Sequence, residues 1–192
     1  SITPDIDRVS QDEACLDITG AVRRFGSPRS LAAELQSSIY EKLALSTSIG
    51  IGPSRVVAKI ASEYRKPLGL TIVENDSLRD FMAAIPIKRL PGVGSVTGRI
   101  LREMGIETAG QLAQVPEMYL KRIFGINGLK IAAYSRGEDG TPFRNYKAVR
   151  TVSRETGFAE DITDKKILLS HFYYLLERAG AKPTGFVASE YA

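Results

Sequence analysis

The chain has 192 residues, 43% of them apolar and 25% charged, and 26 Lys and Arg against 22 Asp and Glu give it a net charge of +4. This composition is typical of folded globular proteins, and no apolar run approaches the roughly 18 residues of a membrane-spanning helix, so disordered and membrane classes are excluded. With only Cys15 and His171 available, a metal site built on Cys and His is excluded too, and any bound metal would need oxygen ligands.

The lone Cys15 cannot form an internal disulfide, and the sequence opens without a charged and then apolar leader. We therefore expect a reduced, cytoplasmic protein with no membrane contact. We also expect the chain to be a piece of a longer protein, because it opens on Ser1 and enters directly into an acidic, strand-like segment.

Residues 1–76 alternate strand and helix patterns. Ser27 is placed to cap a helix whose first residue is Pro28, and glycines and prolines separate the remaining segments. This order predicts helices packed on one face of a mixed or antiparallel sheet, which is an α+β fold. The expected elements are a strand over 6–9, a strand over 14–18, a helix over 28–43, a strand over 46–52, a helix opened by Pro53-Ser54 and a strand over 70–73.

The pattern changes after this region. Residues 77–140 predict a small all-helical domain broken by two glycine turns, Pro91–Gly94 and Gly125–Gly128. Residues 141–150 carry turn formers and few apolar side chains, which favours a linker. Residues 151–192 predict a strand followed by a helix. The expected helices of 77–140 lie over 78–84, through Ile100 and Leu101, around Leu112 and over 129–134.

Positive charge is concentrated in one stretch. Between Lys121 and Arg154, eight basic residues face two acidic ones, an excess of six. Such a stretch is expected where a protein meets a polyanion such as a phosphate backbone. A solvated linker would explain the same charges.

The first glycine turn has the form of a helix-hairpin-helix unit. In Leu90-Pro91-Gly92-Val93-Gly94, the glycines would let the backbone approach a phosphate, and the N-terminus of the next helix would offer N–H groups to it. Gly125–Gly128 would be a partner hairpin. Two ordinary turns between helices remain the alternative.

The adjacent carboxylates Asp12 and Glu13 are the candidate catalytic residues. At a turn both side chains can lean toward one ion, and Mg²⁺ commonly takes one or two carboxylates together with phosphate oxygens. Lys59 and Lys66 could supply cations to a triphosphate. A surface acidic turn and a solvated lysine at a helix end would account for the same residues without any chemistry.

Together these segments resemble the Y-family DNA polymerases, most closely the DNA polymerase IV type. The resemblance extends to about Arg178 and rests on five blocks in one order. The blocks are SQDEACLD at 10–17, TSIGIG at 47–52, AKIAS at 58–62 with KPLGL at 66–70, LPGVG at 90–94 and TVSRE at 151–155.

The resemblance implies roles for the palm residues. Asp12 and Glu13 match the family's paired carboxylates, which bind two catalytic Mg²⁺ ions. Ser10 matches a serine near the primer end, Lys66 a lysine that contacts the incoming deoxynucleoside triphosphate (dNTP), and Lys59 is expected close to the carboxylates.

The resemblance also implies a domain order and partners. Residues 1–76 would be a partial palm, 77–140 a thumb, 141–150 a linker and 151–192 the start of the little finger. The partners would be primer–template DNA, a dNTP and, for the full-length protein, a sliding clamp, with the polymerase itself a monomer. The expected DNA-contacting residues are Gly92, Gly94, Ser95, Thr97, Gly125 and Gly128 in the thumb and Ser153 and Arg154 in the little finger.

The chain also departs from the family pattern. The family's first metal-binding aspartate and its fingers would lie upstream of Ser1, and the tail after Gly180 shows no clamp-binding peptide. The implied activity is damage-bypass DNA synthesis by two-metal nucleotidyl transfer, and we expect residues 1–192 to be inactive alone. The rival interpretations are a non-catalytic helix-hairpin-helix DNA-binding module and a phosphate-binding protein unrelated to DNA.

Overall fold

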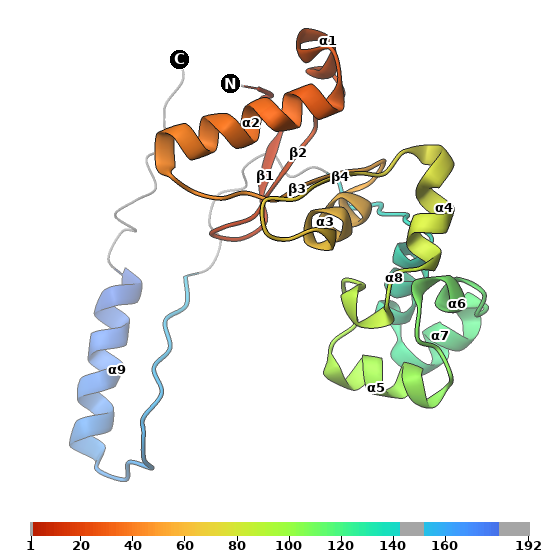
Figure 1. The fold of residues 1–192 in the computed structure, drawn as a ribbon. Helices are drawn as coiled ribbons and strands as arrows, with labels where there is room; N and C mark the ends of the chain where they lie inside the picture. The colour runs from red at the N-terminus through yellow and green to blue at the C-terminus, as the bar shows by residue number, and fades with distance from the viewer. Residues whose placement is uncertain (1, 143–151, 181–192) are drawn as a thin grey trace. The chain divides into compact units, whose positions relative to one another are not determined.

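The computed structural model describes residues 2–142 and 152–180. The chain divides into two compact units, Ser1–Asn145 and Tyr146–Ala192. Figure 1 shows the path of the chain, with strands among helices in the first part of unit 1 and a series of helices in the remainder. The predicted α+β class is confirmed, because two small strand pairs in the first part of unit 1 are followed by helices.

An antiparallel hairpin opens unit 1. Strand β1 (Ile6–Arg8) pairs with β2 (Ala14–Leu16), and Asp7 lies opposite Cys15. The turn closes through the N–H groups of Val9 and Ser10, which both donate to the carbonyl of Glu13 at 2.9 and 3.2 Å. The predicted strand, acidic turn and strand are therefore confirmed. A short helix that the sequence did not predict, α1 (Val22–Phe25), follows the hairpin.

The next two strands form a separate parallel pair. Strand β3 (Ile49–Ile51) pairs with β4 (Leu70–Ile72), with α3 (Arg55–Tyr64) between them in the chain. The prediction of one mixed or antiparallel sheet is thus wrong in detail. Each pair has only two strands of three residues, and no backbone ladder joins the pairs among the described residues.

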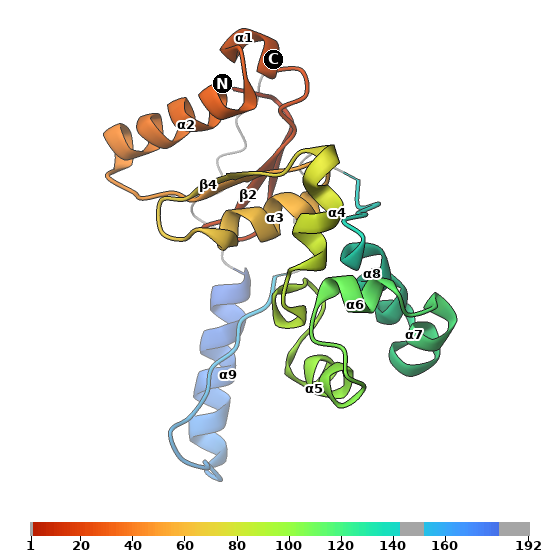
Figure 2. The ribbon, with the colours of Figure 1, turned by 45° about the vertical axis from the view of Figure 1, so that its right-hand side comes forward.

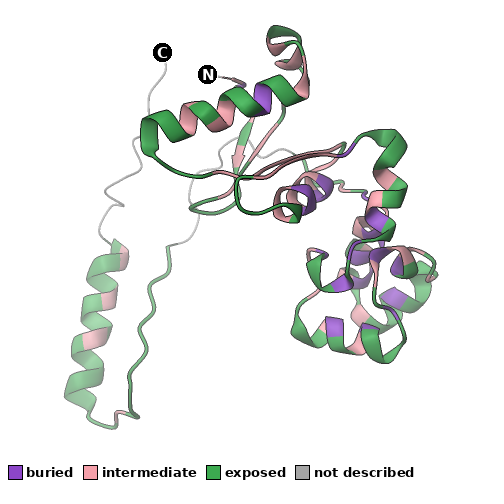
Figure 3. Ribbon diagram, viewed as in Figure 1, coloured by how far each residue is buried: buried purple, intermediate pink, exposed green. Residues whose placement is uncertain are grey.

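Helices α2 (Pro28–Leu43) and α3 lie on opposite sides of the β3–β4 pair in Figures 1 and 2, not on one face as predicted. Both begin where predicted. The hydroxyl of Ser27, the predicted cap, accepts from the N–H of Ser30, and the hydroxyl of Ser54 accepts from the N–H of Val57. The two helices differ in burial. Helix α2 buries only Leu31 and Ala32, whereas one face of α3 is fully covered (Figure 3).

The rest of unit 1 is helical, as predicted. One helix was not predicted, and the last helix begins three residues earlier than predicted. Short segments flanked by proline or glycine show little periodicity. The helices are α4 (Asn75–Ala83), a 3-10 turn (Ile87–Arg89), α5 (Ser95–Glu103), α6 (Ala109–Ala113), the missed α7 (Glu117–Phe124) and α8 (Ile126–Ser135).

One continuous apolar core joins α3 to these helices. Val57 and Ile60 of α3 belong to the same buried cluster as Leu101 of α5, Leu120 of α7 and Ile131 of α8. Figure 3 shows the buried residues concentrated in α3 and the short helices, while α2 is mostly exposed. A polar contact reinforces this junction, because the hydroxyl of Ser54 donates to the carbonyl of Gly137 at 2.6 Å.

In unit 2 the described residues 152–180 contain one helix, α9 (Lys165–Gly180), and no strand. The strand predicted after residue 151 is therefore wrong for these residues, and Thr151 itself lies outside them. His171 packs edge-on against Phe158, with ring centroids 4.8 Å apart. The predicted linker 141–150 lies mostly outside the described residues.

In the described ranges, residues 2–142 and 152–180, no helix combines the length and the apolar character needed to cross a bilayer.

Candidate functional site

The acidic turn holds its two carboxylates in different surroundings. The Ser10 hydroxyl donates to Asp12 Oδ1 at 2.6 Å. This bond is the main cause that lowers the pKa of the Asp12 carboxyl, and the charges of Lys66 and Lys59 add to it. Asp12 is therefore an exposed, ionised carboxylate at neutral pH.

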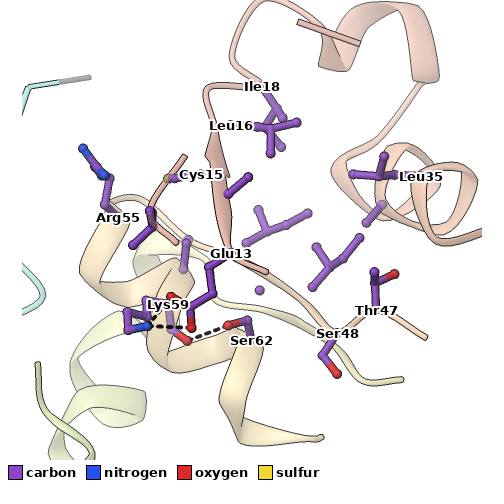
Figure 4. A pocket seen from close by; sticks show the side chains of 18 of the residues that line it. Glu13, Cys15, Leu16, Ile18, Leu35, Thr47, Ser48, Arg55, Lys59 and Ser62 are labelled. Carbon is purple, nitrogen blue, oxygen red and sulfur yellow. Dashed lines mark hydrogen bonds and ion pairs between the residues drawn. The ribbon is translucent and has the colours of Figure 1, made fainter. Parts of the chain in front are cut away.

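Glu13 is paired with Lys59 of α3. The Lys59 ammonium donates to both carboxylate oxygens of Glu13, at 2.9 and 2.8 Å, and lies 3.7 Å from Glu63. Partial burial would lower the pKa of Lys59, but the bonds and charge of Glu13 outweigh it and the pKa is raised. Figure 4 shows the Lys59 and Glu13 side chains pointing toward one another. The predicted proximity of Lys59 to the carboxylates is thus observed.

A pocket of about 790 Å³ extends from this acidic turn. Its polar end includes Asp12, Glu13, Lys59 and Lys66, which come from the β1–β2 turn, α3 and the segment after α3. Its other walls are largely apolar, and Figure 4 shows Leu16 and Ile18 of the hairpin and Leu35 of α2 around it. Strands β2 and β3 and helices α2 and α3 contribute residues to one cavity, which brings together the candidate catalytic and nucleotide-binding side chains, whereas Ser10 is not among the lining residues.

The residues at this turn fit a magnesium ion only as part of a larger ligand set. Among residues 2–142 and 152–180, no group of three or more His, Cys, Asp and Glu side chains is gathered as a metal site. Two carboxylates, of which Asp12 is exposed, suit an ion that takes its other ligands from phosphate oxygens and water.

The first hairpin is a type II turn that leads into α5. The N–H of Val93 donates to the carbonyl of Leu90 at 3.1 Å, and Gly92 has a φ of +86°, as the third position of this turn requires. Helix α5 begins after Gly94 with no side-chain cap. Within the described residues, the N–H groups of its first turn, Ser95 to Thr97, have no acceptor.

The second hairpin is tighter than predicted. Gly125 alone separates α7 from α8, so Asn127 and Gly128 lie in the first turn of α8. Gly128 is buried, and a Cβ there would lie 2.1 Å from the carbonyl oxygen of Leu120. The absence of its side chain thus serves the packing of α8 on α7, whereas Gly125 is exposed, with a φ of +62°.

The sequence did not single out Asn127. Its side-chain amide donates to the carbonyl of Gly92 at 3.0 Å and so links the two hairpins. In the sequence, only the position of Asn127 two residues after Gly125 indicated a role at the turn. Among the basic residues of the 121–154 stretch, Arg136 is held in ion pairs with Glu117 and Glu138, which reduces the charge available to a polyanion.

Ser153 and Arg154 are exposed residues of unit 2 and lie outside any helix. Their contact with template phosphates stays a prediction.

Sequence comparison matches two family models to the chain. The impB/mucB/samB family matches residues 1–63, which contain the acidic turn and most of α3. The thumb domain of DNA polymerase-iota matches residues 88–139, which contain both hairpins.

Curated relatives carry the name DNA polymerase IV. The protein from Methanoculleus marisnigri is 38% identical over 163 residues, covering 85% of this chain and 45% of the relative. The protein from Caulobacter vibrioides is 34% identical over 178 residues, covering 92% of this chain and 44% of the relative. The chain spans about half the length of these relatives.

Solved structures agree. A Y-family DNA polymerase chimera of Dbh and Dpo4 superposes with a TM-score of 0.83 at 27% identity, covering 93% of this chain and 52% of the chimera. An insertion ternary complex of Dbh DNA polymerase gives a TM-score of 0.70 at 26% identity, covering 93% of this chain and 52% of Dbh. The acidic turn, the paired hairpins and these relatives lead to one conclusion: the chain belongs to the Y family of DNA polymerases, in its DinB-like branch.

Proposed function

We propose that this chain supplies the acidic turn and the DNA-gripping thumb of a template-directed, damage-bypass DNA polymerase, which joins a dNTP to a primer 3′-hydroxyl and releases pyrophosphate. The observation that carries the proposal is the cluster of Asp12, Glu13, Lys59 and Lys66 around one pocket. Anionic and cationic side chains at one opening suit a ligand that brings both phosphates and counterions.

In this proposal, Asp12 and Glu13 hold Mg²⁺ together with oxygens of the dNTP. When bound, two such ions would lower the pKa of the primer hydroxyl and neutralise charge on the leaving pyrophosphate. Ser10 orients Asp12 through its 2.6 Å bond. Lys59 holds the Glu13 carboxylate by two hydrogen bonds, and the exposed Lys66 offers its ammonium to the triphosphate.

We further propose that the set of carboxylates is completed by a residue outside residues 1–192. The described residues gather no third carboxylate at the acidic turn. Positional catalysis depends on holding the reacting atoms in a narrow range of geometries, so an incomplete site would be inactive. The full-length enzyme would act as a monomer with a sliding clamp as a further partner.

The test is single-nucleotide extension of a labelled primer with Mg²⁺ and saturating DNA. Residues 1–192 should give no extension, whereas the full-length protein should extend the primer. In the full-length protein, Asp12→Asn or Glu13→Gln should abolish extension, and the exposed Asp76→Asn on α4 should leave it unchanged. Robust extension by residues 1–192, or full activity of the Glu13→Gln enzyme, contradicts the assignment.

A second function, duplex binding by residues 1–192 without chemistry, is favoured by the two hairpins. Helices α5 and α8 both begin at glycines with no side-chain cap, which leaves N–H groups and the positive end of each helix dipole to an anion. Phosphate contacts of this kind are blind to base sequence.

Fluorescence anisotropy with random duplexes measures this binding. Affinity should fall steeply as salt rises, because each neutralised phosphate releases counterions. Gly94→Val should weaken binding with little effect on unfolding, because Gly94 has an ordinary φ of −80° and no atom lies within 4 Å of its Cβ position. Binding that is independent of salt, or confined to one sequence, would refute the proposal.

A further inference from the structure

The contact between the two hairpins joins residues that are 35 positions apart in the chain. The Asn127 side-chain amide donates to the Gly92 carbonyl at 3.0 Å. Asn127 is half-buried in the first turn of α8, and Gly92 is an exposed turn residue ahead of α5. The bond therefore fixes the entrance of one helix against the entrance of the other.

The peptide unit between Gly92 and Val93 is held at both ends. Its carbonyl accepts from Asn127, and its N–H donates to the carbonyl of Leu90 at 3.1 Å. Packing adds to this restraint, because a Cβ on Gly92 would lie 3.2 Å from both Asn127 Oδ1 and Ile131 Cγ2. The turn thus rests directly on α8, and Ile131 is fully buried there.

Two residues beyond this peptide, unbonded N–H groups begin. In the described part of the chain, the N–H groups of Ser95, Val96 and Thr97 have no acceptor. Their direction depends on the turn that precedes them. A turn that can reorient must be ordered when a ligand binds, and that ordering reduces affinity.

We propose that Asn127 is a positioning residue for DNA binding: its amide fixes the first hairpin on α8, so that the N–H groups at the start of α5 are preorganised for a DNA phosphate. The inference rests on the proposed duplex binding by the hairpins. Asn127 itself needs no contact with DNA, because it would act through its bond to the Gly92 carbonyl.

The first experiment measures duplex affinity of the 192-residue chain at low salt. Asn127→Ala should weaken binding by about 5-fold or more, and Asn75→Ala, a matched change at the exposed start of α4, should leave it unchanged. If the parent chain binds no duplex, the proposed function fails. If the parent binds and Asn127→Ala binds equally well, only the role of Asn127 fails.

A double-mutant cycle separates positioning from an independent contact. Ser95→Pro removes one unbonded N–H, and proline is tolerated at the first position of a helix. The extended backbone of Gly94 suits a following proline. If Asn127 acts through these N–H groups, its loss should cost less affinity in the Ser95→Pro chain than in the parent. Strictly multiplicative losses would overturn the proposal.

Amide hydrogen exchange gives a readout without DNA. Asn127→Ala should speed exchange at the Val93 amide, whose peptide loses one of its two restraints, and should leave the Gly98 amide inside α5 unchanged. Unchanged exchange at Val93 would show that Asn127 does not hold the turn, and would overturn the proposal.

Discussion

Gly128→Ala is expected to destabilise unit 1 strongly, although alanine is the better helix former. Gly128 lies in the first turn of α8, and its Cβ position is 2.1 Å from the oxygen and 2.4 Å from the carbon of the Leu120 carbonyl. An ordinary contact needs at least 3.4 Å, so α7 and α8 would have to separate by more than 1 Å. Leu120 and Ile131, both with 0% exposure, lie in the core that this shift would open.

The magnitude follows from two opposing effects. Replacing glycine by alanine within a helix favours folding by up to about 1 kcal/mol. Overpacking a close interface costs about 1–3 kcal/mol and occasionally more, and here the obstacle is backbone, which gives least. We therefore expect a net loss of about 2 kcal/mol in the free energy of unfolding, measured by urea denaturation followed by circular dichroism.

Gly98→Ala is the matched control. Gly98 is also a buried glycine in the first turns of a helix, but its Cβ position lies 3.4 Å from a Val93 methyl group, an ordinary contact. This variant should be as stable as the parent or more stable by up to about 1 kcal/mol. Equal stability of Gly128→Ala and Gly98→Ala would refute the packing role given to Gly128.

Three further predictions concern the acidic turn and the start of α3. Ser10→Ala should raise the pKa of Asp12 toward its ordinary value, seen in an NMR titration of the carboxyl carbon, because the hydroxyl bond is the main cause of the lowered pKa. Lys59→Met should cost less than about 1 kcal/mol in urea, because the pair with Glu13 is 40% exposed on both sides. Since the pKa of Lys59 is raised, this contribution is fully present at neutral pH and is lost as the pH rises through the folded-state pKa, so the parent and Lys59→Met should converge there. Ser54→Ala should cost about 1–2 kcal/mol, because the hydroxyl both caps α3 and bonds the carbonyl of residue 137, and an unchanged urea midpoint would contradict this.

The sequence predicted best the helices that begin at residue types favoured at a helix start. The start of α2 was predicted because Ser27 offers a capping hydroxyl and Pro28 suits the first helical position, and Pro53-Ser54 predicted the start of α3. Helix α7 was not predicted, because the eight residues Glu117–Phe124 between Pro116 and Gly125 are too few to show a clear helical periodicity.

The arrangement in space was harder to predict than the elements. Two strand pairs in place of one sheet depend on pairing between distant segments, which local patterns do not specify. Glu13 and Lys59 were expected near each other from the family resemblance alone, since 46 residues separate them. Gly128 shows the same limit, because a glycine needed for packing and a glycine needed for phosphate approach are identical in sequence.

Helix α3 contacts both the acidic turn and the apolar core of the short helices. One side carries Lys59, which holds Glu13 of the acidic turn, and the other carries Val57 and Ile60, which share a core with the thumb helices. Both sides belong to one ten-residue helix, so no loop lies between them. A movement of the short helices that turned α3 would therefore also move Lys59 and the ion pair that Lys59 makes with Glu13.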